Sequence, residues 1–186
     1  YSAKEMQDSA MGAMVEAAPS VAGSGLMAGA GSTVSGVRSF ARIANIRKQY
    51  SDNEIQVANG VDMVTKLQDN KTENDLFKKQ PDIYEKVLHN ELEGTVYAQT
   101  RIDTELALAD EETAKTFYQL AQDAGYEEEE INAIVENGAD LVLPTELYTS
   151  KVDSGNKMNT FIKFGEGTES IARQKQMKEL FQKEIE

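Results

Sequence analysis

The chain has 186 residues, 40% of them hydrophobic, which is enough to bury a core without metals or disulfides. It contains no cysteine, so thiol nucleophiles, zinc–thiolate sites, iron–sulfur ligation and disulfide frameworks are excluded. The formal net charge is −13, and residues 61–137 hold seven Lys/Arg against nineteen Asp/Glu, a net of −12. Such a surface repels phosphate backbones, so we expect no direct nucleic-acid binding. The charge is either a solvated helical surface or an acidic docking patch.

The start of the chain lacks the features of a secretory signal. It opens on Tyr1 without a charged, an apolar and a small-residue segment in that order. We therefore expect a fragment of a larger protein. The sequence also holds no run of about eighteen apolar residues, the length that a membrane-spanning helix needs.

Residues 1–50 are predicted to form a helical arm rich in Gly and Ala. Pro19 and the glycines from Gly23 onward interrupt any long helix here. Gly25 and Gly29 have the spacing that lets two helices approach closely. The alternative is a flexible leader, because Gly has the largest ordering cost of any residue.

Two helices with apolar faces follow, over 37–46 and 55–67. Ser51 and Glu54 have the spacing of a capping box, which predicts a helix start at Ser51 and the beginning of a compact acidic domain over 51–186. The apolar faces of the two helices are predicted to be core or a self-association surface. With the two glycines they give the candidate helix-packing interface: Gly25, Gly29, Val37, Phe40, Ala44, Ile55, Val61 and Leu67.

The polar residues Asp69–Asp75 predict a turn. Their alternating acids do not make a calcium loop, because Lys71 stands where a ligand is needed and no Gly follows. Pro81 suits the first turn of a helix that ends at Gly94. The β-prone run Thr95–Ala98 is a strand candidate.

The rest of the chain predicts further helices and one more strand. Helices are expected over 103–109, 111–124 and 127–137, the last two stopping at Gly125 and Gly138. Ala139–Pro144 is the second strand candidate, ended by Pro144, which opens a helix over 145–152. Helices over 158–164 and 169–185 close the chain. The predicted fold class is mainly α with a minor β part: a helical domain with a small two-stranded, hairpin-like sheet.

Residues with catalytic potential are few. His89, the only histidine, lies between Glu85 and Glu93 at helical spacing and is interpreted as a surface residue. The glycines of 23–31 lack the Lys-Ser/Thr of a phosphate-binding loop. Glu169–Ser170 matches the start of a lysozyme-like transglycosylase signature, but the rest of that signature is missing. We therefore predict no enzyme, no catalytic residues, no metal and no cofactor.

From Leu67 to about Gln174 the order of features resembles a repeating module of the large polyvalent proteins of phages and conjugative elements. The residues that carry the resemblance are Leu76-Phe77-Lys78-Lys79-Gln80-Pro81-Asp82-Ile83-Tyr84, Thr95-Val96-Tyr97, Ala124-Gly125-Tyr126, Gly138-Ala139-Asp140-Leu141-Val142-Leu143-Pro144 and Leu147-Tyr148.

This resemblance implies a structural, non-catalytic interaction module of an internal virion, DNA-ejection or antirestriction polyprotein. Its partners would be other domains or copies of the parent protein and other virion proteins. Its location would be the virion, with delivery into the host cell and transient membrane contact through the N-terminal arm. Two alternatives come from the charge and the carboxylates: an acidic decoy or inhibitor that binds a basic host surface, and a carboxylate-based peptidoglycan hydrolase.

Overall fold

The computed structural model describes residues 30–51 and 57–185, with side chains from residue 38 onward. The chain divides into two compact units, Tyr1–Ala41 and Arg42–Glu186. The division falls inside the helix α1 (Ala30–Lys48), nine residues before the boundary predicted at residue 50. The last turns of α1 belong to the second unit, where Ile43 and Ile46 are buried.

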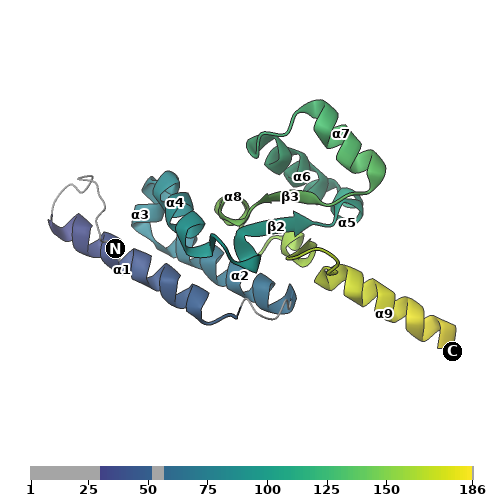
Figure 1. The fold of residues 1–186 in the computed structure, drawn as a ribbon, viewed down its shortest axis with the longest axis horizontal. Coiled ribbons are helices and arrows are strands. Elements are labelled where there is room, and N and C mark those ends of the chain that lie inside the picture. The colour runs from purple at the N-terminus through teal and green to yellow at the C-terminus, as the bar shows by residue number, and fades with distance from the viewer. Residues whose placement is uncertain (1–29, 52–56, 186) are drawn as a thin grey trace. The chain divides into compact units, whose positions relative to one another are not determined.

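The second unit is mainly helical, as predicted (Figure 1). Its helices are α2 (Val57–Glu73), α3 (Asp75–Lys79), α4 (Pro81–Leu92), α5 (Thr104–Leu108), α6 (Glu111–Asp123), α7 (Glu128–Asn137), α8 (Thr145–Lys151) and α9 (Ile171–Ile185). Two short 3-10 helices, η1 (Val96–Ala98) and η2 (Lys157–Thr160), and the strands β2 (Gln99–Ile102), β3 (Leu141–Pro144) and β4 (Ile162–Lys163) complete it.

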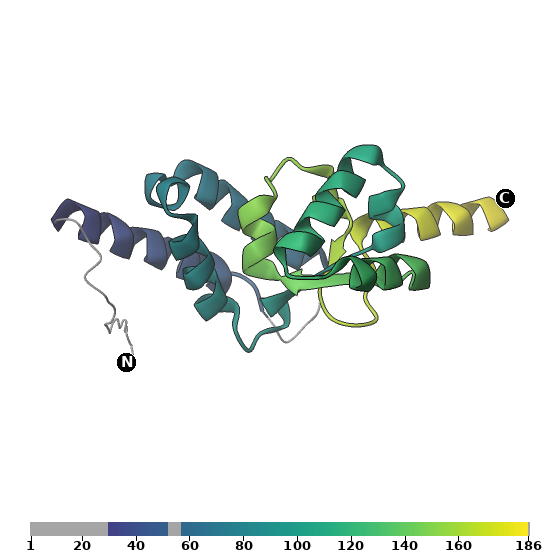
Figure 2. The same ribbon diagram turned by 90° about the horizontal axis from the view of Figure 1, so that it is seen from above.

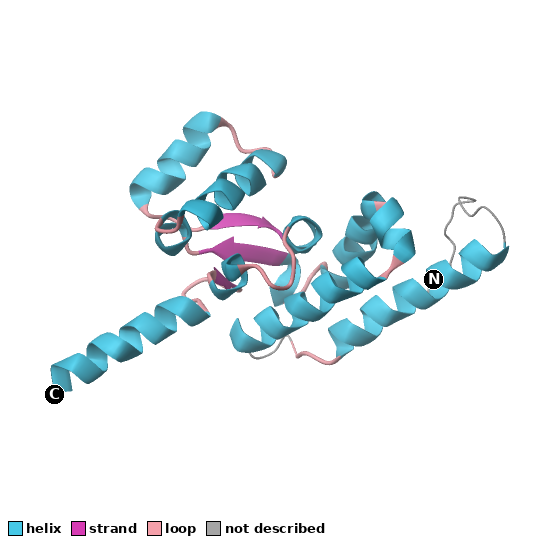
Figure 3. Ribbon diagram, turned by 180° about the vertical axis from the view of Figure 1, so that it is seen from behind, coloured by secondary structure: helices cyan, strands magenta, loops and turns pink. Residues whose placement is uncertain are grey.

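The sheet is antiparallel with the strand order β3-β2-β4. Thr100 pairs with Leu143 on one edge of the central strand, and Ile102 pairs with Ile162 on the other. Helices α6 and α7 lie on one side of the sheet and α2 on the other (Figures 2 and 3). The second strand candidate forms β3, but its partner is β2, which begins one residue after the first candidate, Thr95–Ala98. Three helices separate β2 from β3, however, so the pair is not a hairpin.

The sheet has three strands rather than the predicted two, and one helix prediction was wrong. Residues 158–164 were expected to be helical, but only the 3-10 turn η2 forms before the chain enters β4. The Asn156 side chain accepts a hydrogen bond from the Met158 amide at 2.8 Å and starts this short turn. Residues 161–164 therefore do not form a helix. Ile162 is buried as part of β4, and the neighbouring Phe161 and Phe164 are buried as well.

The first strand candidate is displaced by a few residues. Residues 96–98 form η1, because the Thr95 hydroxyl accepts a hydrogen bond from the Tyr97 amide and donates one to the Leu92 carbonyl. This turn buries the Tyr97 ring, and the strand begins only at Gln99.

The predicted turn at Asp69–Asp75 was also wrong, because α2 continues through Glu73. The Lys71 ammonium group donates to the carbonyls of Thr149 and Ser150 at 2.9 Å each, at the end of α8. A cation at a helix C-terminus is favoured by the free carbonyls and by the macrodipole. This long-range contact extends the helix, and only Asn74 remains as the N-cap of α3.

The core is apolar and contains a buried polar cluster around Asn159. Its largest fully buried side chains are Tyr84, Tyr97, Tyr148, Phe77, Phe117, Phe164, Ile43, Met63, Leu67, Leu88, Leu92 and Ile102. The amides of Gln68 and Asn159 exchange two hydrogen bonds, at 3.1 and 3.0 Å, and the Tyr148 hydroxyl donates to Asn159. Because these groups are satisfied inside the protein, the cluster fixes α2, α8 and η2 to one another.

Candidate functional site

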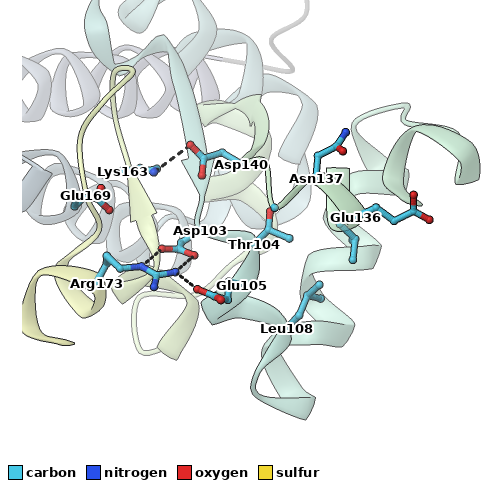
Figure 4. A pocket seen from close by; sticks show the side chains of 12 residues that line it. Asp103, Thr104, Glu105, Leu108, Glu136, Asn137, Asp140, Lys163, Glu169 and Arg173 are labelled. Carbon is cyan, nitrogen blue, oxygen red and sulfur yellow. Dashed lines mark hydrogen bonds and ion pairs between the residues drawn. The ribbon is translucent and has the colours of Figure 1, made fainter. Parts of the chain in front are cut away.

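An open cleft with a volume of about 640 Å³ lies where the sheet meets the start of α9 (Figure 4). The lining side chains come from β4, the loops next to β2 and β3, the ends of α5 and α7, and the root of α9. They are Asp103, Thr104, Glu105, Leu108, Val135, Glu136, Asn137, Gly138, Asp140, Lys163, Glu169 and Arg173. Five acids against two bases give the lining a formal net charge of −3.

Arg173 clamps the first turn of α9 to the start of α5. Its guanidinium group donates to both oxygens of Asp103, at 3.0 Å each, and to Glu105 at 2.6 Å. These acids raise the pKa of Arg173 further, Asp103 contributing most. A fork-shaped pair of this kind fixes orientation as well as distance. The root of α9 is therefore held in one direction relative to the sheet.

Local capping explains why these groups meet. Asp103 is the N-cap of α5 and accepts a hydrogen bond from the Leu106 amide at 3.2 Å. Ser170 is fully buried, and its hydroxyl oxygen accepts one from the Arg173 amide at 3.1 Å. Each cap begins a helix at the cleft, and the two helix starts are then joined by the Arg173–Asp103 pair.

A second ion pair lies at the back of the cleft. The Lys163 ammonium group is 3.1 Å from the Asp140 carboxylate, and Arg101 is 3.9 Å from the same carboxylate. Lys163 is almost fully buried on β4, while Asp140 precedes β3. The pair therefore bridges the two edge strands of the sheet.

Both cations of the cleft are held in ion pairs, although acids outnumber them. Asp103 lies 3.0 Å from Arg173, and Asp140 lies 3.1 Å from Lys163. Ser170, which the sequence placed in a possible transglycosylase signature, serves as a helix cap. These contacts position structural elements.

His89 lies away from the cleft on the exposed side of α4. Its Nδ1 atom is 2.8 Å from a Glu146 oxygen of α8, and not in contact with Glu85 or Glu93 as the helical spacing predicted. The partner comes from a helix 57 residues later in the chain, which local spacing does not reveal. Among the described residues no group of three or more His, Asp or Glu side chains is arranged to hold a metal ion.

Helix α9 is the most exposed element of the second unit. None of its 15 residues is buried. Beyond the Arg173 clamp it extends away from the sheet (Figures 1 and 2). Its large apolar side chains are exposed: Ile171, Met177, Leu180, Phe181 and Ile185. The only other large hydrophobic residue exposed in the described part of the chain is Tyr118.

The helix-packing interface that the sequence predicted is only partly within the described residues. Gly25, Gly29 and Ile55 lie outside them, and the side chain of Val37 is not described. Phe40 and Ala44 are half-buried on α1, Val61 is half-buried on α2, and Leu67 is a core residue. Their role in self-association stays a prediction.

Sequence reasoning missed the apolar face of α9, because the helix was taken as part of the compact domain. The sequence signal for this face is the spacing of Met177, Phe181 and Ile185, four residues apart, which places them on one side of the helix.

No described helix is long and apolar enough to cross a membrane. Comparison with protein-family models, with curated proteins and with solved structures gave no match. The function is therefore inferred from this chain's own residues.

Proposed function

We propose that the chain is a non-catalytic interaction module of a larger phage or mobile-element protein, carried in the particle, and that α9 is its docking element. One observation carries the proposal: a 15-residue helix, clamped at its root, presents five large apolar side chains and buries none of its residues. Exposed apolar patches on soluble proteins mark contact sites. The assignment to phage and mobile-element proteins rests on the sequence resemblance described above.

The clamp supports this role because it gives the exposed helix a defined direction. Arg173 binds Asp103 in a bidentate pair, and Ser170 caps the helix below it. A docking helix held in this way loses less conformational freedom on binding than a free peptide does. The ion pair between Arg173 and Asp103 thus serves the presentation of α9.

Methionine oxidation in purified particles of the parent element tests the proposal. We expect mass spectrometry to find peptides of this chain in the particles, and Met177 to be oxidised by dilute peroxide at least roughly tenfold more slowly there than in the dilute isolated chain. Met63 and Met158 are fully buried and report whether the fold is intact. Absence of the chain from particles, or equal oxidation rates of Met177, would overturn the proposal.

A second candidate function is the acidic decoy, favoured by the exposed run Glu127–Glu130 at the start of α7. This function predicts capture of a basic protein that weakens steeply with salt. The matched variant replaces the four glutamates with glutamine and leaves α9 unchanged. Binding that survives both 0.5 M salt and this variant would exclude the decoy.

A further inference from the structure

We infer that the partner of α9 is α9 of a second copy of this chain, packed antiparallel, with the two Phe181 rings at the centre of the contact. This inference rests on the proposed role of α9 as a docking element and names its partner. The exposed fractions are 53% for Met177, 63% for Leu180, 64% for Phe181 and 68% for Ile185. Side chains of this kind are normally covered.

The arrangement of the apolar residues is symmetric about Phe181. Met177 lies four residues before it and Ile185 four residues after it, so the three form one ridge along the helix. A two-fold contact requires a surface that is complementary to itself. When two such ridges meet in opposite directions around Phe181, Met177 of each copy lies beside Ile185 of the other.

The exposed area is sufficient for a weak dimer. Ile171 lies outside the contact, because its counterpart across Phe181 would fall beyond the end of α9. At the observed exposures Met177, Leu180, Phe181 and Ile185 leave roughly 500 Å² open, which is near the upper end for the largest apolar patch of a monomer. Two copies together bury roughly 1,000 Å², about the lower limit of a specific interface. We therefore expect a dissociation constant on the order of micromolar.

The charges of α9 favour the antiparallel direction. The helix carries four cations and two acids, and its first half, up to Lys178, holds three of the cations and no acid. The second half holds both acids, Glu179 and Glu184, with Lys183. In an antiparallel pair centred on Phe181, Lys178 of each copy lies level with Glu184 of the other, because the two residues are three positions before and after the centre. Parallel helices in register would instead place Lys178 level with Lys178 and Glu184 level with Glu184. Opposed macrodipoles add to this preference.

Sedimentation of the full chain between about 1 and 200 µM tests the pairing, a range that brackets the expected affinity. We expect a monomer–dimer equilibrium, and we expect Phe181→Glu to raise the dissociation constant at least roughly tenfold by placing two like charges at the centre. Tyr118→Glu is the matched control, because this exposed aromatic residue lies on α6 and should leave the equilibrium unchanged. Circular dichroism checks that both variants fold.

Cross-linking tests the direction, since the chain has no cysteine of its own. With a rise of 1.5 Å per residue, an antiparallel pair centred on residue 181 separates the two copies of residue 182 by about 3 Å along the axis and the two copies of residue 174 by about 21 Å. We expect Gln182→Cys to be linked by a short bismaleimide and Gln174→Cys not to be linked. Linking of both variants would show a parallel pair and overturn the inference.

The remaining outcomes separate this inference from the proposed function. A monomer at 200 µM, or a dimer that Phe181→Glu leaves intact, overturns the α9 pairing. If Met177 is nevertheless protected in particles, the proposed function stands and another protein covers α9. If the isolated chain dimerises but its peptides are missing from particles, the pairing stands and the proposed function falls. Assembly that grows without limit as concentration rises contradicts a closed two-fold contact.

Discussion

Burial raises the pKa of the Glu91 carboxyl group on α4, although Lys48 and Arg47 act in the opposite direction. The residue is half-buried. Burial disfavours its ionised form more than the two cations of α1 favour it, so the pKa rises. At neutral pH the ionised group therefore destabilises the folded state.

We expect Glu91→Gln to stabilise the protein at pH 7. The folded state holds the Glu91 proton more tightly than the unfolded chain, so wild-type stability falls as the pH rises from about 4.5 through the raised pKa. Because glutamine does not ionise, the stability of Glu91→Gln does not fall in this way. Urea unfolding at pH 7 should show a gain beyond the roughly 0.5 kcal/mol scatter of ordinary surface substitutions, and no gain at pH 4. The exposed Glu93→Gln is the control, and an equal gain in both variants at both pH values would contradict the explanation.

At the scale of elements, α2 approaches the sheet closely at Gly60. A Cβ atom added there would lie 2.4 Å from two ring carbons of Phe164, the residue that follows β4. Both residues are buried, and Phe164 also packs edge-to-face against Tyr97 at 5.5 Å between ring centroids. The contact between α2 and the edge strand therefore depends on the absence of a side chain at residue 60.

We expect Gly60→Ala to destabilise the protein by about 1–3 kcal/mol, because the overlap with Phe164 outweighs the gain of about 1 kcal/mol in helix propensity. Thermal and urea unfolding measure the change. Gly155→Ala is the control, since a Cβ atom there meets open space. The double variant with Phe164→Leu should recover part of the Gly60→Ala loss, and simple additivity of the two would show that the ring is not responsible.

The elements that the sequence predicted well are those with local signals. Gly125 and Gly138 adopt positive φ angles where the sequence placed helix ends, and Pro144 joins β3 to α8 as expected. The errors arose where contacts distant in the chain decide the structure. Lys71 extends α2 by binding carbonyls 78 and 79 residues later, and β4 forms because residues 101 and 102 of β2 pair with it.

The candidate site follows the same division. The helix over 169–185 and the four-residue spacing of Met177, Phe181 and Ile185 can be read from the sequence. Whether that face is buried depends on where the helix leaves the sheet. That direction is set by Arg173 and Asp103, which are 70 residues apart and carry no shared local pattern.

At the scale of the second unit, its folding stability comes from the body, meaning the unit without the part of α9 beyond Arg173. None of the residues of α9 is buried, so the part beyond Arg173 contributes little to the core. The Arg173–Asp103 pair belongs to the body, since the Asp103 side chain is only 8% exposed. Stability and docking are therefore expected to respond to different changes in the same helix.

We expect a chain that ends after Gln176 to unfold at the same temperature as the intact chain, within about 1 °C at concentrations where both are monomeric, because no buried group is removed. Arg173→Met in the intact chain should instead lower the free energy of unfolding by roughly 2–3 kcal/mol. Breaking a fully buried ion pair usually costs more, but Arg173 is itself one-quarter exposed. Arg173→Lys, which keeps the charge but loses the fork, should lie between the two. Scanning calorimetry orders the three variants. A shortened chain less stable than Arg173→Met would show that the end of α9 packs on the body after all.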